Sequence, residues 1–435
     1  MQRPFPLVLL FVALSIPAIT PADAGDWPTW RGPTMDGRVA AGDLPSRWSR
    51  TENVRFRVDL PGPAAATPLV VGDRVFVTTT VKGSPALRVL AFSTADGALL
   101  WGDEPDAGTL EVFERFATET SLASPSPAAG GGRLYVLFGT GQLIAYSMDG
   151  DVRWRRDLTA AYGEPRLYFG LASSPLYVDG RLYLQLLHGG RQAVVAVDAS
   201  NGEDVWTHRR TTDARKECLH VYTSPVLAGD GESANLVIHG ADYTTGHRLS
   251  DGAELWRHGG LNPKESYNPS LRLVSTPVVS GRLLIVPTAK RGPVYALRLD
   301  GARGDLTGGA AVSWKLERGT PDVPSPLVDG GIVYLLSENG RLNALDLESG
   351  AAIYEERVHQ STHRASPILV GDKLVLTATD GTISVVRAGR TYELLAKNEL
   401  GERLAASPAF ARSTLYLRSY DALWAIGRTA GKASR

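Results

Sequence analysis

A Ser-Pro or Thr-Pro pair recurs along this sequence at intervals of one supersecondary unit. Eight such prolines lie 41 to 59 residues apart, and a hydroxyl residue precedes every one of them. The pairs are Thr67-Pro68, Ser126-Pro127, Ser174-Pro175, Ser224-Pro225, Thr276-Pro277, Ser325-Pro326, Ser366-Pro367 and Ser407-Pro408. Repeats of this period are typical of propeller blades, each of which is one small sheet.

The residues between the pairs predict four strands per unit. In six units an apolar run such as RVFV at 74–77 begins six residues after the proline. A second run follows with a small central residue, then an Asp-Gly or Asn-Gly turn that tolerates the positive φ of a tight hairpin. The small residues are Ala91, Ala145, Ala196, Ala296, Ala344 and Ala425. A last strand carries an aromatic residue, which is Trp101, Trp154, Trp206, Trp256, Trp314 or Tyr354.

One architecture satisfies this pattern. A four-stranded sheet cannot bury both of its faces alone, so the units must stack face to face. Stacking around an axis leaves only short, protected edges, and proline suits the start of the edge strand beside the central channel. We therefore expect an all-β, eight-bladed propeller of four-stranded antiparallel blades. Seven blades is the alternative, because the fourth unit is irregular after Pro225.

The two ends of the repeat region predict how the ring closes. The eighth unit stops near Arg428 without its aromatic strand. Residues 53–60 (NVRFRVDL) match residues 151–158 (DVRWRRDL) at five of eight positions, with Phe56 at the place of Trp154. We expect the N-terminal strand to complete the last blade and so remove an open sheet edge.

The first residues predict export from the cytoplasm. Arg3 precedes an apolar run from Leu7 to Ile19, and Ala22-Asp23-Ala24 follows, which is the pattern of a secretory signal peptide. The run is shorter than the ~20 residues that span a bilayer, although an uncleaved anchor is the alternative. We divide the chain into a signal peptide (1–24), an N-terminal segment (25–50), the propeller (51–427) and a C-terminal tail (428–435).

Charge and cysteine content exclude several classes of protein. Lys and Arg number 46, as do Asp and Glu, so the chain lacks the net basic charge expected of a nucleic-acid binder. Cys218 is the only cysteine, which excludes an internal disulfide, a CxxC metal site and a lipid-modified cysteine after the apolar run. We expect a periplasmic or secreted monomer with no transmembrane segment after cleavage.

The units ending in Asp-Gly-x-x-x-Trp, as in 96–101 and 149–154, resemble the PQQ-repeat β-propellers over residues 51–427. That superfamily includes quinoprotein alcohol dehydrogenases and the propeller lipoprotein of the outer-membrane barrel-assembly machine. The segment DWPTWRGPTMDGRV at 26–39 and the strings ADYTTGHRLSDG, GPVYALR and ELGERLAASPAF are similar to those of secreted bacterial PQQ-like repeat proteins. The resemblance implies the fold; one propeller class serves unrelated functions.

The resemblance also supplies a catalytic alternative. In alcohol-oxidising members it implies a quinone in the channel, Ca²⁺ held by Glu, Asn and Asp side chains, an Asp base and often a disulfide between adjacent cysteines. Cys218 has no cysteine neighbour, and no Asp, Asn and Glu cluster matches residue by residue. We therefore expect no catalytic residue and no cofactor, with a PQQ-dependent oxidoreductase using PQQ and Ca²⁺ as the alternative. Among the eight histidines, only His359 and His363 are four apart, and they lie in a predicted loop, so no metal site is expected.

The loops that enter the first strands are predicted to converge on one mouth of the channel, where ligand sites commonly form. The candidate binding residues are Glu119, Tyr168, His220, Tyr222, Asp242, His247, Arg272, Asp322, His363, Arg364, Glu402 and Arg403. We predict a non-catalytic binding or assembly platform that recognises an envelope protein or a small ligand there. A scaffold that offers strand edges to client peptides is a further alternative. Residues 111–120 are predicted to form a short helix over the mouth, and Gly301–Ala311 a surface hairpin.

Overall fold

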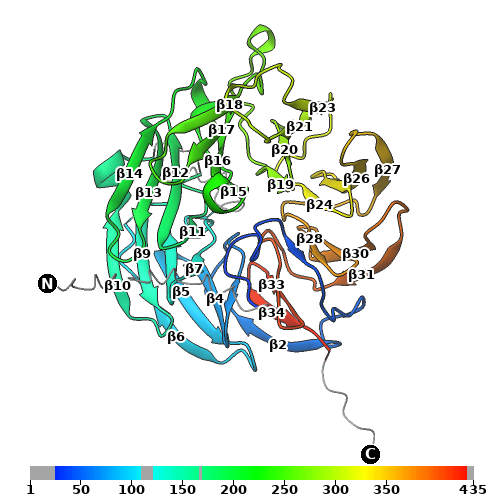
Figure 1. The fold of residues 1–435 in the computed structure, drawn as a ribbon. Helices are drawn as coiled ribbons and strands as arrows, with labels where there is room; N and C mark the ends of the chain where they lie inside the picture. The colour runs from blue at the N-terminus through cyan, green and yellow to red at the C-terminus, as the bar shows by residue number, and fades with distance from the viewer. Residues whose placement is uncertain (1–24, 109–120, 166–168, 429–435) are drawn as a thin grey trace, which may run out of the picture.

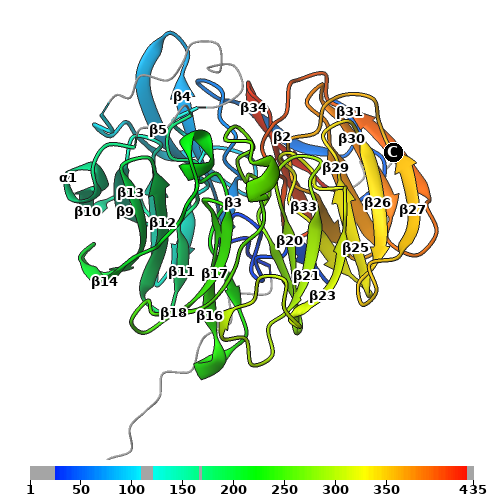
Figure 2. The same cartoon turned by 90° about the horizontal axis from the view of Figure 1, so that it is seen from above.

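The strands form eight β-sheets around a common axis (Figure 1). The computed structural model describes residues 25–108, 121–165 and 169–428. Each sheet contains four antiparallel strands, and two sheets carry a fifth strand. Figure 2 shows the ring from its edge, with the strands of neighbouring sheets side by side. The eight-bladed propeller is confirmed, and the seven-bladed alternative is wrong because the irregular fourth unit is a complete blade.

The first four blades are numbered along the chain, each from its inner strand outward. They consist of β3 (Leu69–Val71), β4 (Arg74–Val81), β5 (Ser84–Ser93) and β6 (Leu99–Asp103); β7 (Ala128–Gly130), β8 (Arg133–Leu137), β9 (Gln142–Ser147) and β10 (Val152–Asp157); β11 (Leu176–Val178), β12 (Arg181–His188), β13 (Arg191–Asp198) and β14 (Asp204–Arg209); and β15 (Val226–Ala228), β16 (Asn235–Gly240), β17 (Tyr243–Arg248) and β18 (Glu254–His258).

The remaining four blades repeat this order. They consist of β19 (Val278–Ser280), β20 (Leu283–Pro287), β21 (Val294–Arg298) and β23 (Val312–Leu316); β24 (Leu327–Asp329), β25 (Ile332–Leu336), β26 (Arg341–Asp346) and β27 (Ala352–Arg357); β28 (Ile368–Val370), β29 (Lys373–Thr377), β30 (Thr382–Arg387) and β31 (Leu394–Glu399); and β32 (Ala409–Ala411), β33 (Thr414–Arg418), β34 (Ala422–Ile426) and β2 (Val54–Asp59).

Helix is confined to short connections. The helical segments of the described residues are α1 (Leu158–Tyr162), η2 (Lys216–Leu219), η3 (Gly231–Ser233) and η4 (Lys264–Ser266). None of these is long and apolar enough to cross a membrane.

The small and aromatic positions of the repeat lie opposite each other. Ala91 pairs with Trp101, Ala145 with Trp154 and Ala196 with Trp206, and Gly246 takes the small position opposite Trp256. The aromatic ring then reaches the next blade. The ring of Trp154 lies against Gly202, where a Cβ would stand 2.8 Å from it, and its Nε1 donates to the Ala199 carbonyl at 3.1 Å. Each hairpin glycine of this kind therefore serves a positive φ and a close inter-blade approach at once.

The N-terminal strand closes the ring as predicted. β2 pairs antiparallel with β34, with Phe56 opposite Ala425, and the Leu60 amide donates to the Asp421 carbonyl at 2.8 Å. Figure 1 shows this blue strand beside the red strand β34. Phe56 lies against Gly97 of the first blade, in the same way that Trp154 lies against Gly202.

Two short strands add to the blades in parallel. β1 (Arg38–Val39) pairs with the inner strand β28, and β22 (Gly304–Asp305) pairs with the outer strand β18. The predicted surface hairpin at 301–311 is therefore wrong: its residues extend the fourth blade, and the Leu306 amide donates to the Arg257 carbonyl at 2.7 Å.

Replacing Phe56 tests the closing strand. Phe56 is buried, and its ring centroid lies 6.4 Å from that of Tyr416. We expect Phe56→Ala to lower the free energy of unfolding by about 3–5 kcal/mol, because a buried aromatic side chain is lost. Urea unfolding followed by circular dichroism measures the change. The exposed neighbour gives the control, Arg55→Ala, for which we expect a change within about 0.5 kcal/mol; equal effects of the two substitutions would contradict the packing described.

Candidate functional site

The recurring hydroxyl residues form a chain of hydrogen bonds around the axis. The backbone amide of each one donates to the hydroxyl oxygen of its counterpart in the next blade. Seven such bonds, of 2.9–3.1 Å, run from Thr67 through Ser126, Ser174, Ser224, Thr276, Ser325 and Ser366 to Ser407. The hydroxyl before each proline therefore joins neighbouring blades, which explains why all eight pairs carry one.

The chain of hydrogen bonds ends where the last blade meets the first. Thr67 is fully buried, and its Oγ1 has no hydrogen-bond partner among the described residues. The step from Ser407 to Thr67 thus lacks the bond that joins the other blades. Closure of the ring there depends on β2 instead.

The N-terminal segment crosses the channel. The amide of Trp27 donates to the Val70 carbonyl of blade 1 at 2.7 Å, and the Pro28 carbonyl accepts from Ala129 of blade 2. On the other side of the ring, Arg31 Nη2 donates to the Pro326 carbonyl at 3.0 Å, and β1 pairs with β28 of blade 7. The segment therefore spans the ring and makes the channel mouth a closed cup.

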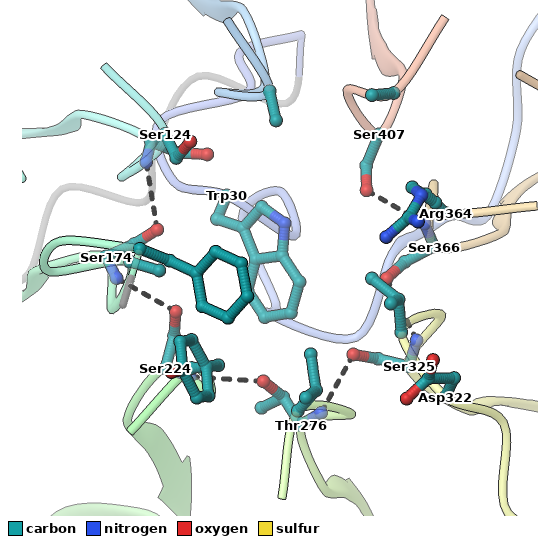
Figure 3. A pocket seen from close by; sticks show the side chains of 18 of the residues that line it. Trp30, Ser124, Ser174, Ser224, Thr276, Asp322, Ser325, Arg364, Ser366 and Ser407 are labelled. Carbon is teal, nitrogen blue, oxygen red and sulfur yellow. Dashed lines mark hydrogen bonds between the residues drawn. The ribbon is translucent and has the colours of Figure 1, made fainter. Parts of the chain in front are cut away.

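Trp30 of this segment forms the floor of the cup. Figure 3 shows its indole in the middle of the cavity, with Ser174, Ser224, Thr276, Ser325, Ser366 and Ser407 around it. The cavity has a volume of about 270 Å³. Phe169 and Tyr222 form an aromatic wall, with ring centroids 5.6 Å apart in an edge-to-face arrangement. Arg272, Asp322 and Arg364 provide its charged groups.

A continuous line of ion pairs borders one side of the mouth. Arg272 lies between Glu217 (3.1 Å) and Asp322 (3.8 Å). Lys290 Nζ lies between Asp322 (3.1 Å) and Glu338 (2.8 Å). These residues come from the loops of several successive blades, so the ion pairs fix the loops relative to one another.

The outer carboxylates of this line differ in pKa. Burial raises the pKa of Glu217 and Asp322 adds to the rise, while Arg272 opposes it. Burial alone would raise the pKa of Glu338 as well, but the hydrogen bond from Lys290 reverses the shift and lowers it. Burial would lower the pKa of Lys290, and the carboxylates of Glu338 and Asp322 raise it instead. The Lys290–Glu338 pair is therefore held in its ionised form.

The structure brings four of the predicted site residues together. Tyr222, Arg272, Asp322 and Arg364 line the cavity. Glu119 and Tyr168 lie outside the described residues, as does the segment 111–120 for which a helix was predicted.

The remaining six candidates are not among the described residues that line the cavity. Glu402 accepts from Trp424 Nε1 at 3.0 Å and pairs with Arg57 at 2.9 Å, so it fixes the last blade. Arg403 stacks over the ring of Tyr420, with its guanidinium carbon 5.1 Å from the centroid. Asp242 lines a different cavity.

The three histidine candidates are buried inside blades or loops. His247 lies within β17, where its ring nitrogens contact Thr245 Oγ1 at 2.9 Å and the Gly252 carbonyl at 3.0 Å. His363 Nδ1 contacts the Ser361 carbonyl at 3.1 Å. His220 is buried, and burial lowers its pKa. These side chains therefore serve packing and local hydrogen bonding.

Sequence reasoning missed the floor and half of the aromatic wall of the cup. Trp30 belongs to the non-repeating segment, and Phe169 lies in an inter-blade loop. The string DWPTWR, with two tryptophans and an arginine before the repeats begin, is the signal that could have found Trp30. The recurring hydroxyl residues are evident in the sequence, whereas the part they play in lining the cavity is seen only in the structure.

The lining does not fit a quinone held with calcium. Ca²⁺ takes about six to eight oxygen ligands, mainly carboxylates and carbonyls. Asp322 is the one carboxylate in the described lining, and it is already paired with Arg272 and Lys290. Among the residues that the structure describes, the lining contains no Asn, Glu or Cys. The described lining therefore has no cluster of carboxylate and amide side chains for the metal.

Comparison with known proteins gives the family. The model described as outer membrane protein assembly factor BamB matches residues 28–123, 88–354 and 252–433. The chain belongs to this family. The BamB of Yersinia pestis is 26% identical over 273 residues, which are 61% of this chain and 61% of that protein. The BamB of Moranella endobia (strain PCIT) is 25% identical over 355 residues, 79% of this chain and 80% of that protein.

Solved structures agree with this fold. BamB from Moraxella catarrhalis has a TM-score of 0.60 at 14% identity, covering 87% of this chain and 98% of that chain. The quinohemoprotein alcohol dehydrogenase from Comamonas testosteroni has a TM-score of 0.66 at 14% identity, covering 96% of this chain and 83% of that chain. At this identity the likeness shows the fold alone. The predicted kinship with PQQ-like propellers is confirmed.

Two threonines test the hydroxyl chain as a matched pair. Thr276 Oγ1 accepts from the Ser224 amide at 3.1 Å, whereas Thr67 Oγ1 has no partner, and both residues are buried. We expect Thr276→Val to destabilise the protein by about 1–3 kcal/mol, because it leaves a buried amide unpaired. We expect Thr67→Val to be neutral or stabilising, because it removes a buried oxygen without a partner. Urea unfolding of both variants measures this difference, and the reverse order would contradict the bonding described.

Buried histidines make the fold sensitive to mild acid. Burial lowers the pKa of His188, His247 and His363 to about 4 and that of His239 to about 3. Between those values and the ordinary pKa near 6.5 the unfolded chain binds more protons, so stability falls as pH falls. Each such histidine lowers the free energy of unfolding by up to about 1.4 kcal/mol for each pH unit of acidification in that range. We expect the free energy of unfolding, measured with urea, to fall between pH 6.5 and pH 5. A constant or rising free energy of unfolding over that range would contradict the neutral state of these side chains.

Proposed function

We propose that this chain is an extracytoplasmic, non-catalytic platform that binds a partner at the channel mouth. The observation that carries the proposal is the closed cup itself, with an aromatic floor at Trp30 and charged side chains at its rim. A concave cavity on which aromatic and polar groups converge is a common form of recognition site. Membership in a family described as outer membrane protein assembly factors supports a role in assembly.

The chemistry of the cup favours an extended segment or a small ligand with an apolar end. The indole of Trp30 and the rings of Phe169 and Tyr222 offer apolar surface, while Arg272 and Arg364 offer guanidinium donors. Arg272 is held by two carboxylates, so its position is fixed before a partner arrives. Such preorganisation lowers the entropy cost of binding.

We place the protein in the cell envelope, in the periplasm or released from it. The pattern of residues 1–24 predicts a signal peptide. Relatives are named as outer membrane protein assembly factors, which supports the same compartment. A partner from the envelope follows from this placement.

Strand addition at a blade edge is a second candidate for the binding mode. The outer strand β18 already accepts β22 in parallel, which shows that a blade edge of this chain can take another strand. The edge strand β6 carries Leu99 and Leu100, which are 59% and 46% exposed. A client peptide bound in this way would use main-chain hydrogen bonds rather than the cup.

Substitution at the rim separates the two binding modes. We expect Arg272→Ala to reduce capture of an envelope partner at least tenfold, because the substitution removes a fixed guanidinium from the mouth. The matched control is Arg282→Ala, since Arg282 also forms an ion pair, with Glu348 at 3.0 Å, and precedes β20 at the hairpin end of the same blade. Quantitative pull-down from envelope extract, with both variants at equal concentration, measures the difference.

The outcomes of this experiment are distinct. Equal capture by wild type and Arg272→Ala contradicts a site at the mouth and favours an edge. The oxidoreductase alternative has its own test, in which the protein is incubated with PQQ and Ca²⁺ and dye reduction is followed with alcohols and sugars. We expect no cofactor-dependent turnover; turnover would contradict a non-catalytic platform.

A further inference from the structure

A second cavity lies beside blade 4, and none of its lining residues belongs to the channel cup. Its volume is about 290 Å³. The turn between β16 and β17 forms one wall, and the loops that follow β14 and β18 form the others. The residues that carry the argument are Asp213, Asp242, Tyr243, Asn262, Lys264 and Tyr267.

The turn that presents Asp242 is strained and held in place. Ala241 and Asp242 have φ values of +47° and +64°, which residues other than glycine rarely adopt. The buried guanidinium of Arg210 fixes the turn by donating to the carbonyls of Gly240 at 2.7 Å and Tyr243 at 2.6 Å. Conformations of this kind persist where the surroundings enforce them, and they cluster at functional sites.

Asp242 brings an unsatisfied acceptor into the cavity. The residue is 5% exposed. Its Oδ2 accepts from the Tyr267 hydroxyl at 2.6 Å, but its Oδ1 has no hydrogen-bond partner among the described residues. Asn262 lies beside it, and its amide nitrogen directs its two donors to the Asn268 carbonyl at 3.0 Å and to Cys218 Sγ at 3.5 Å. Burying a carboxylate oxygen without a hydrogen-bond donor costs free energy. A ligand that supplies a donor to this oxygen would therefore be stabilised here.

The outer part of the cavity already attracts cations of the chain itself. Asp213 accepts from the Tyr243 hydroxyl at 2.9 Å and pairs with Lys264 Nζ at 2.9 Å. The guanidinium of Arg215 lies 4.2 Å from the centre of the Tyr267 ring. The Lys264 side chain is 80% exposed, so it can leave Asp213 at little cost. Within the described part of the chain, no ion pair joins Lys264 or Arg215 to Asp242.

We propose that this cavity binds a primary ammonium group, with Asp242 Oδ1 as its deep acceptor and Asp213 as its outer carboxylate. An ammonium carries three donors and no acceptor, which matches an oxygen that lacks a donor. Arg215 lies over the Tyr267 ring and Arg257 over the Tyr243 ring, so both rings already attract cations. The group comes either from a free alkylamine or from a lysine side chain of a polypeptide. This site is independent of the function proposed for the cup.

The test uses the full chain and n-butylammonium chloride as the probe, with 1-butanol as its neutral analogue. Isothermal titration in buffers of matched ionic strength measures both. We expect binding of butylammonium and not of butanol, and at least a tenfold loss of affinity in Asp242→Asn. The control is Asp251→Asn, because Asp251 lies exposed in the next hairpin of the same blade; we expect no change there.

A second variant keeps the test decisive if Asp242→Asn does not fold. Lys264→Met removes an exposed competitor for Asp213, so we expect it to tighten butylammonium binding, which a purely structural lysine would not do. Equal binding of butanol, unchanged affinity in folded Asp242→Asn, or weaker binding in Lys264→Met would overturn the proposal. A Gly-Lys-Gly peptide distinguishes the sources: tighter binding than butylammonium indicates a polypeptide lysine, and equal or weaker binding indicates a free amine.

Discussion

The contact between an aromatic side chain of one blade and a hairpin glycine of the next is the interaction on which this molecule depends. A Cβ on Gly150, Gly202 or Gly252 would stand within 3 Å of the ring of Trp101, Trp154 or Trp206. The same rings donate from Nε1 to backbone carbonyls of the neighbouring blade. A small residue pairs with each ring from inside its own sheet, so each blade narrows toward the axis. Stacking wedges of this shape side by side favours closure into a ring.

The N-terminal part of the chain both closes the ring and forms part of the site. β2 completes the last blade, and the segment before it crosses the channel from blade 1 to blade 7. The hydroxyl chain around the axis stops at Thr67, so the strand pairing of β2 joins the last blade to the first where that bond is missing. Trp30 becomes the floor of the cup only because the segment is anchored on both sides. The cup is therefore a consequence of closure.

The repeated features of the fold could be predicted from the sequence, whereas the contacts that occur only once could not. The Ser/Thr-Pro pairs, the small and aromatic positions and the likeness of residues 53–60 to 151–158 predicted the blades and their closure, since each rests on a local period. Trp30 and the partners of Asp242 depend on contacts between distant segments that no period marks. His247 and Glu402 do not line the cup and form hydrogen bonds with the Gly252 carbonyl and Trp424 Nε1, because polar residues of this fold also bond within their own blades. Four of the twelve candidates, Tyr222, Arg272, Asp322 and Arg364, line the cup.

A designed disulfide between the two ends tests the central claim that the head of the chain closes the ring. Asp59 and Ala422 lie directly opposite in β2 and β34, and such pairs have Cα atoms about 4.5–5.5 Å apart, which suits a disulfide. The measurement is the state of the two thiols in Asp59→Cys/Ala422→Cys, made in a Cys218→Ser background without reductant. The account predicts an intramolecular disulfide that keeps the terminal fragments joined after proteolysis. Free thiols, or disulfide-linked dimers alone, would contradict it.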